Sequence, residues 1–229
     1  MPAKIHLERQ IDQITTVLLR MVSGADTMLA ECVQAFLERN VDLAKKVMDD
    51  DDSIDHLDNV VDEKCLEILA LEQPVAVDLR YVVAAMRLTV NLERIADEAC
   101  NIAGHTIELT AIPPSLPHPV MREFCRHALA MYRASVESFR SGDVPLARKV
   151  CDMEEQADSY YAKAVHTCFA ELSGEVQSTQ ISLFRIFISR ALERICDLST
   201  NIAEITVFAY EGSVIKHHWQ QALAESREK

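Results

Sequence analysis

Apolar residues recur every seven positions along three stretches of the chain. This spacing is typical of the packing edge of a helix in a bundle. The three series are Val47, Ile54 and Val61; Tyr81, Leu88, Ile95 and Ile102; and Ile181, Ile188, Ile195 and Ile202. A single helix cannot bury its own apolar edge, so the pattern predicts long helices packed against one another.

Prolines and turn residues divide this helical pattern into two halves. Four prolines fall in the segment "IPPSLPHP" at 112–119, and proline cannot continue a helix. We therefore expect a first three-helix bundle over 1–111, a Pro-rich linker over 112–119 and a second three-helix bundle over 120–212. A polar C-terminal tail over 213–229 follows.

Turn signals outline three helices in each half. The first half predicts helices over about 4–39, 41–72 and 74–110, with a cap at Asn40 and with Pro74 in the first turn of the third. The second half predicts a helix over about 119–140, a fifth that starts after the N-cap Asp143 and ends near Gly174, and a sixth that ends near Gly212.

The two halves also resemble each other in sequence. The segment "NLERIADEACNIA" starts at Asn91, and "ALERICDLSTNIA" starts 100 residues later at Ala191. In the same way "AKKVMDDDDSID" from Ala44 matches "ARKVCDMEEQAD" from Ala147. An internal duplication explains both matches. The predicted fold is all-α, with two tandem, pseudo-symmetric three-helix bundles and six long helices.

Composition and charge limit the classes of function that the chain can have. The net charge is −13, which disfavours nucleic-acid binding because phosphate contacts require Lys and Arg. An acidic chain suits bound cations or a partner with a basic face. The 7 cysteines are scattered and form no CxxC pair, as in a reducing compartment. With no basic-then-apolar leader and no apolar stretch of about 20 residues, we expect a cytoplasmic protein that does not insert into membranes.

Pairs of carboxylates four residues apart occur in equivalent places of both halves. Positions i and i+4 share one helix face, about 5–6 Å apart at Cβ. The four pairs are Asp51 and Asp55, Glu93 and Asp97, Glu154 and Asp158, and Glu193 and Asp197. Further polar or charged side chains at matching positions are Asn101, Asn201, Arg94 and Arg194.

Two interpretations of these acidic pairs remain open, a solvated helix surface and a metal site. Two observations favour the metal site: the acidic pairs recur at equivalent positions of both halves, and the acids continue an apolar stripe along their helix. Carboxylates that are crowded and partly desolvated need neutralisation. Oxygen ligands suit iron, manganese or magnesium, and also zinc. A ferritin-like di-iron enzyme would need Glu-x-x-His, which is absent. Phosphate loops, GxSxG and HExxH are absent too, so we expect no enzyme.

The chain resembles the PhoU family of phosphate uptake regulators over nearly its whole length. The segments that carry this resemblance are "QPVAVDLR" from Gln73, "LERIADEACNIA", "LERICDLSTNIAE" and "DDSID". The resemblance implies a fold of two three-helix bundles, and multinuclear iron or zinc clusters on the four acidic pairs. The glycine of the family pattern "ERIGD" is replaced here by Ala96 and Cys196.

The resemblance also implies a function. A PhoU-like protein restrains the phosphate starvation response when phosphate is sufficient, as an adaptor between the ATPase subunit of the phosphate ABC transporter and a sensor histidine kinase. We also expect a homodimer. A metal-dependent enzyme or a metal buffer on the same helical scaffold is the alternative.

Overall fold

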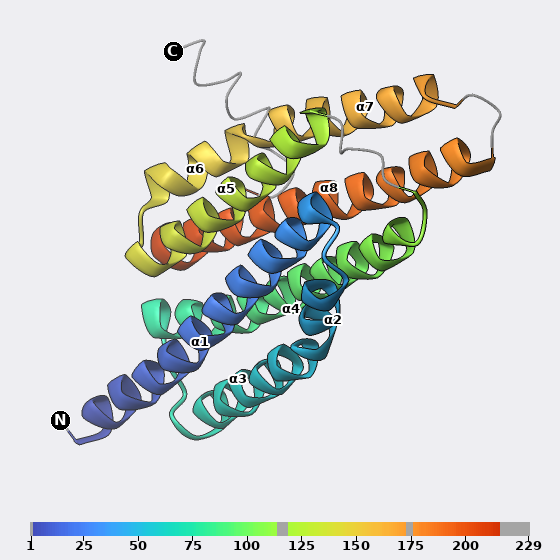
Figure 1. Ribbon diagram of the computed structural model, residues 1–229. Helices are drawn as coiled ribbons and strands as arrows, with labels where there is room; N and C mark the ends of the chain where they lie inside the picture. Colours follow the sequence, from blue (N-terminus) through green and yellow to red (C-terminus); the bar gives the residue numbers. More distant parts are fainter. Residues whose placement is uncertain (1, 114–118, 173–175, 216–229) are drawn as a thin grey trace, which may run out of the picture.

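The computed structural model describes residues 2–113, 119–172 and 176–215, and the regular structure in these ranges is α-helix alone (Figure 1). The helical segments are α1 (Pro2–Glu38), α2 (Val41–Asp49), α3 (Asp51–Leu71), α4 (Ala76–Thr110), α5 (Pro119–Ser141), α6 (Val144–Asp152), α7 (Glu154–Ala170) and α8 (Val176–Glu211).

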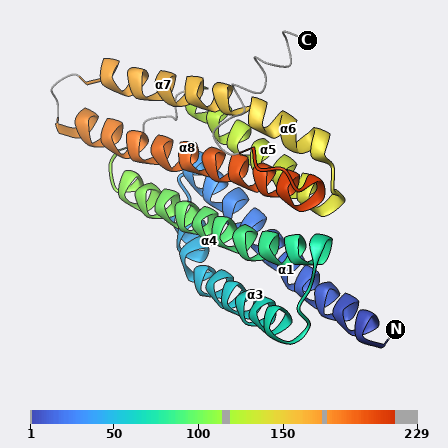
Figure 2. The same cartoon turned by 180° about the vertical axis from the view of Figure 1, so that it is seen from behind.

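These segments form two three-helix bundles. In the first, α1 and α4 pack with the rod formed by α2 and α3; in the second, α5 and α8 pack with the rod formed by α6 and α7. The bundles meet mainly through α4 and α8, which lie side by side and run in opposite directions (Figures 1 and 2). The predicted all-α architecture with two similar bundles is confirmed.

The predicted packing edges form the core. Residues Val47, Ile54 and Val61 are buried on α2 and α3, and the last three residues of each longer series are buried on α4 and α8. Only the first residue of each longer series, Tyr81 and Ile181, is half-buried. The seven-residue spacing thus marks the side of each long helix that faces its bundle.

The second helix of each bundle is interrupted by one residue, which the apolar pattern does not predict. Asp50 separates α2 from α3, and Met153 separates α6 from α7. Both keep near-helical backbone angles, with φ and ψ of −80° and −10° at Asp50 and −75° and −15° at Met153. The change is therefore a slight tightening of one turn. Each break falls directly before an acidic pair.

The predicted caps are confirmed, whereas the place of Pro74 is not. The side chains of Asn40 and Asp143 accept hydrogen bonds from the backbone N–H groups of Leu43 and Leu146. We expected Pro74 in the first turn of α4, but α4 begins at Ala76 after the N-cap Val75. The reason is that Gln73 and Ala76 adopt positive φ angles of 48° and 47°, so the chain turns before the helix starts.

Some predicted features lie outside the described residues. Most of the Pro-rich linker, at 114–118, and the tail beyond residue 215 belong to this group. Within the described ranges, no helix has both the length and the apolar content needed to cross a membrane. All seven cysteines are free, and all except the half-buried Cys100 are buried.

Candidate functional site

The acidic pairs lie where the second and third helices of each bundle pack together. The first acidic cluster comprises Asp51 and Asp55 on α3 with Glu93 and Asp97 on α4. The second acidic cluster comprises Glu154 and Asp158 on α7 with Glu193 and Asp197 on α8. The breaks at Asp50 and Met153 place the first member of each α3 or α7 pair at a helix N-terminus, where the helix dipole favours negative charge.

The carboxylates of the first acidic cluster raise one another's proton affinity. Partial burial raises the pKa of Asp51, Glu93 and Asp97, and the charge of Asp55 raises all three further. Arg94 opposes this effect by lowering the pKa of Glu93 and Asp97. Because these rises remain, the arginine does not neutralise the cluster.

The second acidic cluster repeats this arrangement. Burial raises the pKa of Glu193 and Asp197, and Asp158 raises both further. Glu154 acts on the neighbouring thiols, since its charge contributes to the raised pKa of the buried Cys196. The structure therefore brings acids from two helices into mutual influence in each bundle.

The donor chemistry of both clusters fits a hard or borderline cation. Four carboxylates from two helices supply only oxygen donors, which suit iron, manganese, magnesium or zinc. As the side chains stand, no three carboxylate, imidazole or thiol groups of the described residues are arranged so that they could hold a metal ion. The residue types and charges fit a metal, and the ligand geometry stays a prediction.

The polar residues predicted beside the acids have different contacts. Asn101 Nδ2 donates to Glu98 Oε2 at 3.1 Å, and Arg194 Nε lies 2.9 Å from Glu98 Oε1. Arg194 thus reaches from the second bundle to the first, where it also lowers the pKa of Asp97. Asn201 is exposed to solvent.

Further groups outside the four predicted pairs lie at these clusters. Asp58, one turn beyond Asp55, has a buried oxygen without a hydrogen-bond partner and raises the pKa of Glu93. The spacing of acids along α3, at positions 51, 55, 58 and 62, predicts this continuation of the acidic stripe. Arg190 Nη1 lies 3.2 Å from Glu193 Oε2 as an ion pair that lacks hydrogen-bond geometry. The thiol of Cys100 donates to the backbone oxygen of Val47 at 3.7 Å, and burial together with the charge of Asp51 raises its pKa to about 12.

The two residues that replace the family glycine lie in the interior. His105 stacks on Phe187 with ring centroids 5.0 Å apart, and Glu98 pairs with Arg194. Since α4 and α8 are antiparallel, these two contacts set a register in which residue 96 lies level with residue 196. Ala96 and Cys196 are fully buried, so their side chains affect packing inside the molecule.

Known proteins similar to the chain share its duplicated architecture. The family model described as "PhoU domain" matches twice, at residues 18–106 and 121–206. The phosphate-specific transport system accessory protein PhoU homolog of Caulobacter vibrioides is 29% identical over 204 residues, which cover 89% of each chain. The homolog from Pseudomonas aeruginosa is 28% identical over 217 residues, which cover 93% of this chain and 90% of the relative.

Solved structures agree with the fold. The crystal structure of PhoU from Pseudomonas aeruginosa superposes with a TM-score of 0.86 at 28% identity, and covers 90% of this chain and 99% of that one. The regulatory protein PhoU from Streptococcus pneumoniae has a TM-score of 0.84 at 21% identity, covering 92% and 99%, and supports the fold alone.

Proposed function

The chain belongs to the PhoU family, and on that premise we propose that it is a metal-binding accessory regulator of phosphate-specific transport. Relatives carrying that name match along about nine-tenths of the chain. Both repeats are present, so the proposal covers the whole described molecule and not one module of it.

The observation that carries the metal part of the proposal is the pair of equivalent acidic clusters. Carboxylates with raised proton affinity occur at matching positions of both bundles. A solvated acidic surface would not require a half-buried glutamate at the same position of each repeat, as Glu93 and Glu193 are. A cation offsets the repulsion in each cluster and favours the ionised form of every carboxylate that contacts it.

Under this proposal the cluster residues hold iron or zinc, with manganese or magnesium as the weaker candidates. Asp51, Asp55, Glu93 and Asp97 serve the first bundle, and Glu154, Asp158, Glu193 and Asp197 serve the second. The bound metal supplies positive charge that ties α3 to α4 and α7 to α8. The protein's own contribution is to hold two carboxylates on each of the two facing helices.

The regulatory part of the proposal concerns partners. We infer a cytoplasmic adaptor that contacts the ATPase subunit of the phosphate transporter and a sensor histidine kinase, with a homodimer as the assembly. The metal fixes the helix surfaces that these partners recognise. The alternative, a metal-dependent enzyme or metal buffer, predicts turnover of a phosphoester or redox cycling by the metal-loaded protein.

The test compares acid-to-amide variants of the clusters with a matched control. Glu93→Gln/Asp97→Asn and Glu193→Gln/Asp197→Asn each remove two charges from one cluster. Glu63→Gln/Glu67→Gln removes the same charge at the same spacing from an exposed face of α3. We expect protein purified without chelators or affinity metals to retain iron or zinc in elemental analysis, and only the cluster variants to lose it.

Repression of phosphate-starvation genes in cells is the second measurement. We expect the cluster variants to lose repression and the Glu63→Gln/Glu67→Gln control to keep it. If the cluster variants lose metal but keep full repression, the metal plays no part in signalling. If the purified parent chain holds no metal, the acidic clusters are solvated surfaces.

A further inference from the structure

A cavity of about 720 Å³ lies between the two bundles, away from both acidic clusters. Its walls come from α1 and α4 of the first bundle and from α5, α6 and α8 of the second. Small-molecule sites typically have volumes of about 300–1,000 Å³ and often lie between domains. The cavity has the size and the position of such a site.

The lining of the cavity is largely apolar and includes an aromatic wall. Tyr81 and Phe139 stack with ring centroids 6.1 Å apart, and Phe139 meets Tyr210 edge-on at 6.4 Å. Aliphatic lining residues are Leu18, Leu19, Val22, Leu88, Val136 and Leu146. Leu19 and Tyr210 are 43% and 45% exposed, so water reaches this apolar surface. Burying it under a ligand would be favourable.

Three hydroxyl groups of the cavity, those of Thr15, Tyr81 and Tyr210, are already engaged as donors. Thr15 Oγ1 donates to the backbone oxygen of Ile11 at 2.9 Å, so Tyr81 is the donor in its 2.6 Å contact with Thr15 Oγ1. Tyr210 donates to the backbone oxygen of Phe139 at 3.0 Å. The Tyr81 oxygen keeps lone pairs and can accept one hydrogen bond. The structure therefore offers a ligand an acceptor at Tyr81.

The charged residues at the cavity are paired with one another. Arg133 makes a two-bond contact with Asp26, with Nε–Oδ1 at 2.7 Å and Nη2–Oδ2 at 3.1 Å. Arg140 makes a similar contact with Glu137, with both distances 2.8 Å. Two arginines and two carboxylates leave the rim without net charge. An anionic ligand would have to displace a carboxylate that already occupies the guanidinium fork.

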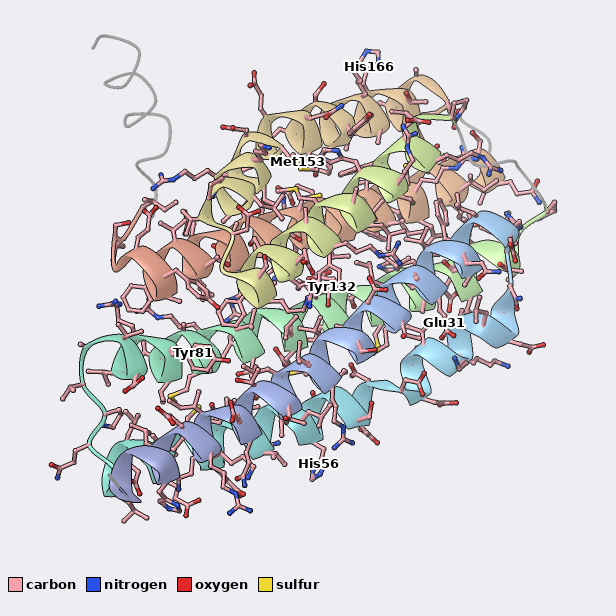
Figure 3. The ribbon with its side chains drawn as sticks, turned by 90° about the vertical axis from the view of Figure 1, so that its left-hand side faces the viewer. Glu31, His56, Tyr81, Tyr132, Met153 and His166 are labelled. Atoms are coloured by element: carbon pink, nitrogen blue, oxygen red, sulfur yellow. The ribbon has the colours of Figure 1, made fainter. Side chains whose placement is uncertain are left out.

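We propose that this cavity binds a neutral, mostly aromatic small molecule that carries one hydrogen-bond donor. The ligand stacks on the Tyr81–Phe139–Tyr210 wall and donates to the Tyr81 oxygen. Figure 3 shows Tyr81 on α4 and Tyr132 on α5 at the level where the two bundles adjoin. Because the walls belong to both bundles, the ligand contacts both and links them where α1 and α5 adjoin.

The test uses two fluorescent probes that differ in one charged group. N-phenyl-1-naphthylamine is neutral, has aromatic rings and carries one N–H donor, whereas 1-anilinonaphthalene-8-sulfonate adds a sulfonate to the same skeleton. We expect the neutral probe to bind the full chain with one-to-one stoichiometry, and the sulfonate to bind about tenfold more weakly or not at all. Equal or tighter binding of the sulfonate would overturn the assignment to neutral ligands.

Four variants locate the probe. Ala134→Trp places a large ring in the cavity and should abolish saturable binding, while Ala162→Trp on the exposed side of α7 should leave it unchanged. Tyr81→Phe removes the acceptor and should weaken binding about fivefold. Leu19→Lys adds a charge at an exposed lining position, and therefore provides a second test if Ala134→Trp does not fold.

Three outcomes would contradict the proposal. The first is probe binding that survives both Ala134→Trp and Leu19→Lys in folded protein, as judged by circular dichroism. The second is stoichiometry well above one. The third combines two results: the parent chain binds no probe, and sedimentation velocity shows that these two variants dissociate a dimer. The cavity would then be an interface between copies of the chain.

Discussion

The ion pair between Glu98 and Arg194 leads to a quantitative prediction, because the duplication supplies its own reference. Glu98 is 9% exposed in its side chain, whereas Arg194 is 54% exposed. The residue equivalent to Glu98 in the second repeat is Leu198, which is also buried. Arg94, the equivalent of Arg194, therefore has no equivalent glutamate to pair with. One repeat carries the interaction and the other carries its apolar replacement.

We predict that Arg194→Met lowers the free energy of unfolding by about 1–2 kcal/mol, between the values for exposed pairs and those for fully buried pairs. The loss arises because the buried Glu98 carboxylate keeps only the hydrogen bond from Asn101. Glu98→Leu should change stability by less than about 1 kcal/mol, since an apolar group of similar size replaces the charge. In that background Arg194→Met should cost about 0.5 kcal/mol or less.

Urea unfolding in the presence of a chelator measures these values without any contribution from metal. The matched control is Arg94→Met, which removes the same side chain from the equivalent position and should cost less than about 0.5 kcal/mol. Equal costs for Arg194→Met and Arg94→Met would refute the reasoning. Additive effects of Glu98→Leu and Arg194→Met would refute it as well.

Three further predictions concern the acidic clusters and the turns. In the presence of a chelator, the free energy of unfolding of the parent chain should rise more than that of Asp97→Asn/Asp197→Asn when the pH falls from 7 toward the ordinary carboxyl pKa values of 3.8 and 4.5. The reason is that a carboxyl group whose pKa is raised by folding destabilises the folded state once it is ionised. Equal dependence of the unfolding free energy on pH in the two proteins, measured by chemical denaturation, would contradict this. Gly142→Ala should cost about 1–2 kcal/mol in thermal unfolding, because φ is +68° and the new Cβ would lie 2.7 Å from Tyr210; an unchanged midpoint would be inconsistent with the structure. Asn40→Ala should cost about 1 kcal/mol in urea unfolding through loss of the cap to Leu43, and Asn40→Asp, which keeps an acceptor, should restore it.

Local spacing explains why much of the fold could be predicted from the sequence. The burial of Leu88, Ile95 and Ile102 follows from a seven-residue repeat, because helical periodicity alone determines which residues share a face. The caps at Asn40 and Asp143 follow from side chains that bond their own backbone three residues on. Such interactions depend on neighbours in the chain and not on tertiary packing.

The breaks in the second helices depend on tertiary structure and could not be predicted in the same way. The backbone oxygen of Met153 accepts a hydrogen bond from His127 Nε2 at 3.1 Å, and the break has no proline or glycine to mark it. The run of four aspartates at 49–52 is a partial signal, since aspartate favours helix starts.

In the candidate site, too, the features that depend on local spacing were predictable and those that depend on tertiary packing were not. Spacing placed Glu93 with Asp97 and Glu193 with Asp197 on common helix faces, and the structure adds the acids of α3 and α7 beside them. The pairing of Arg194 with Glu98 requires knowledge of how α4 crosses α8, which no local pattern contains. The one usable signal was that Glu98 aligns with Leu198 in otherwise similar segments.

The antiparallel contact of α4 with α8 has a consequence for recognition. Two identical chains meeting in this way would be bound by twofold symmetry to present the same residues at both ends of the contact. Covalent linkage removes that constraint. Glu98 pairs with Arg194 on one side of the level of residues 96 and 196, whereas Leu198 stands at the equivalent position on the other side. The exposed Arg194 is therefore paired with a glutamate whereas the exposed Arg94 has no equivalent glutamate, so a partner lying across the joint would meet two different arginines.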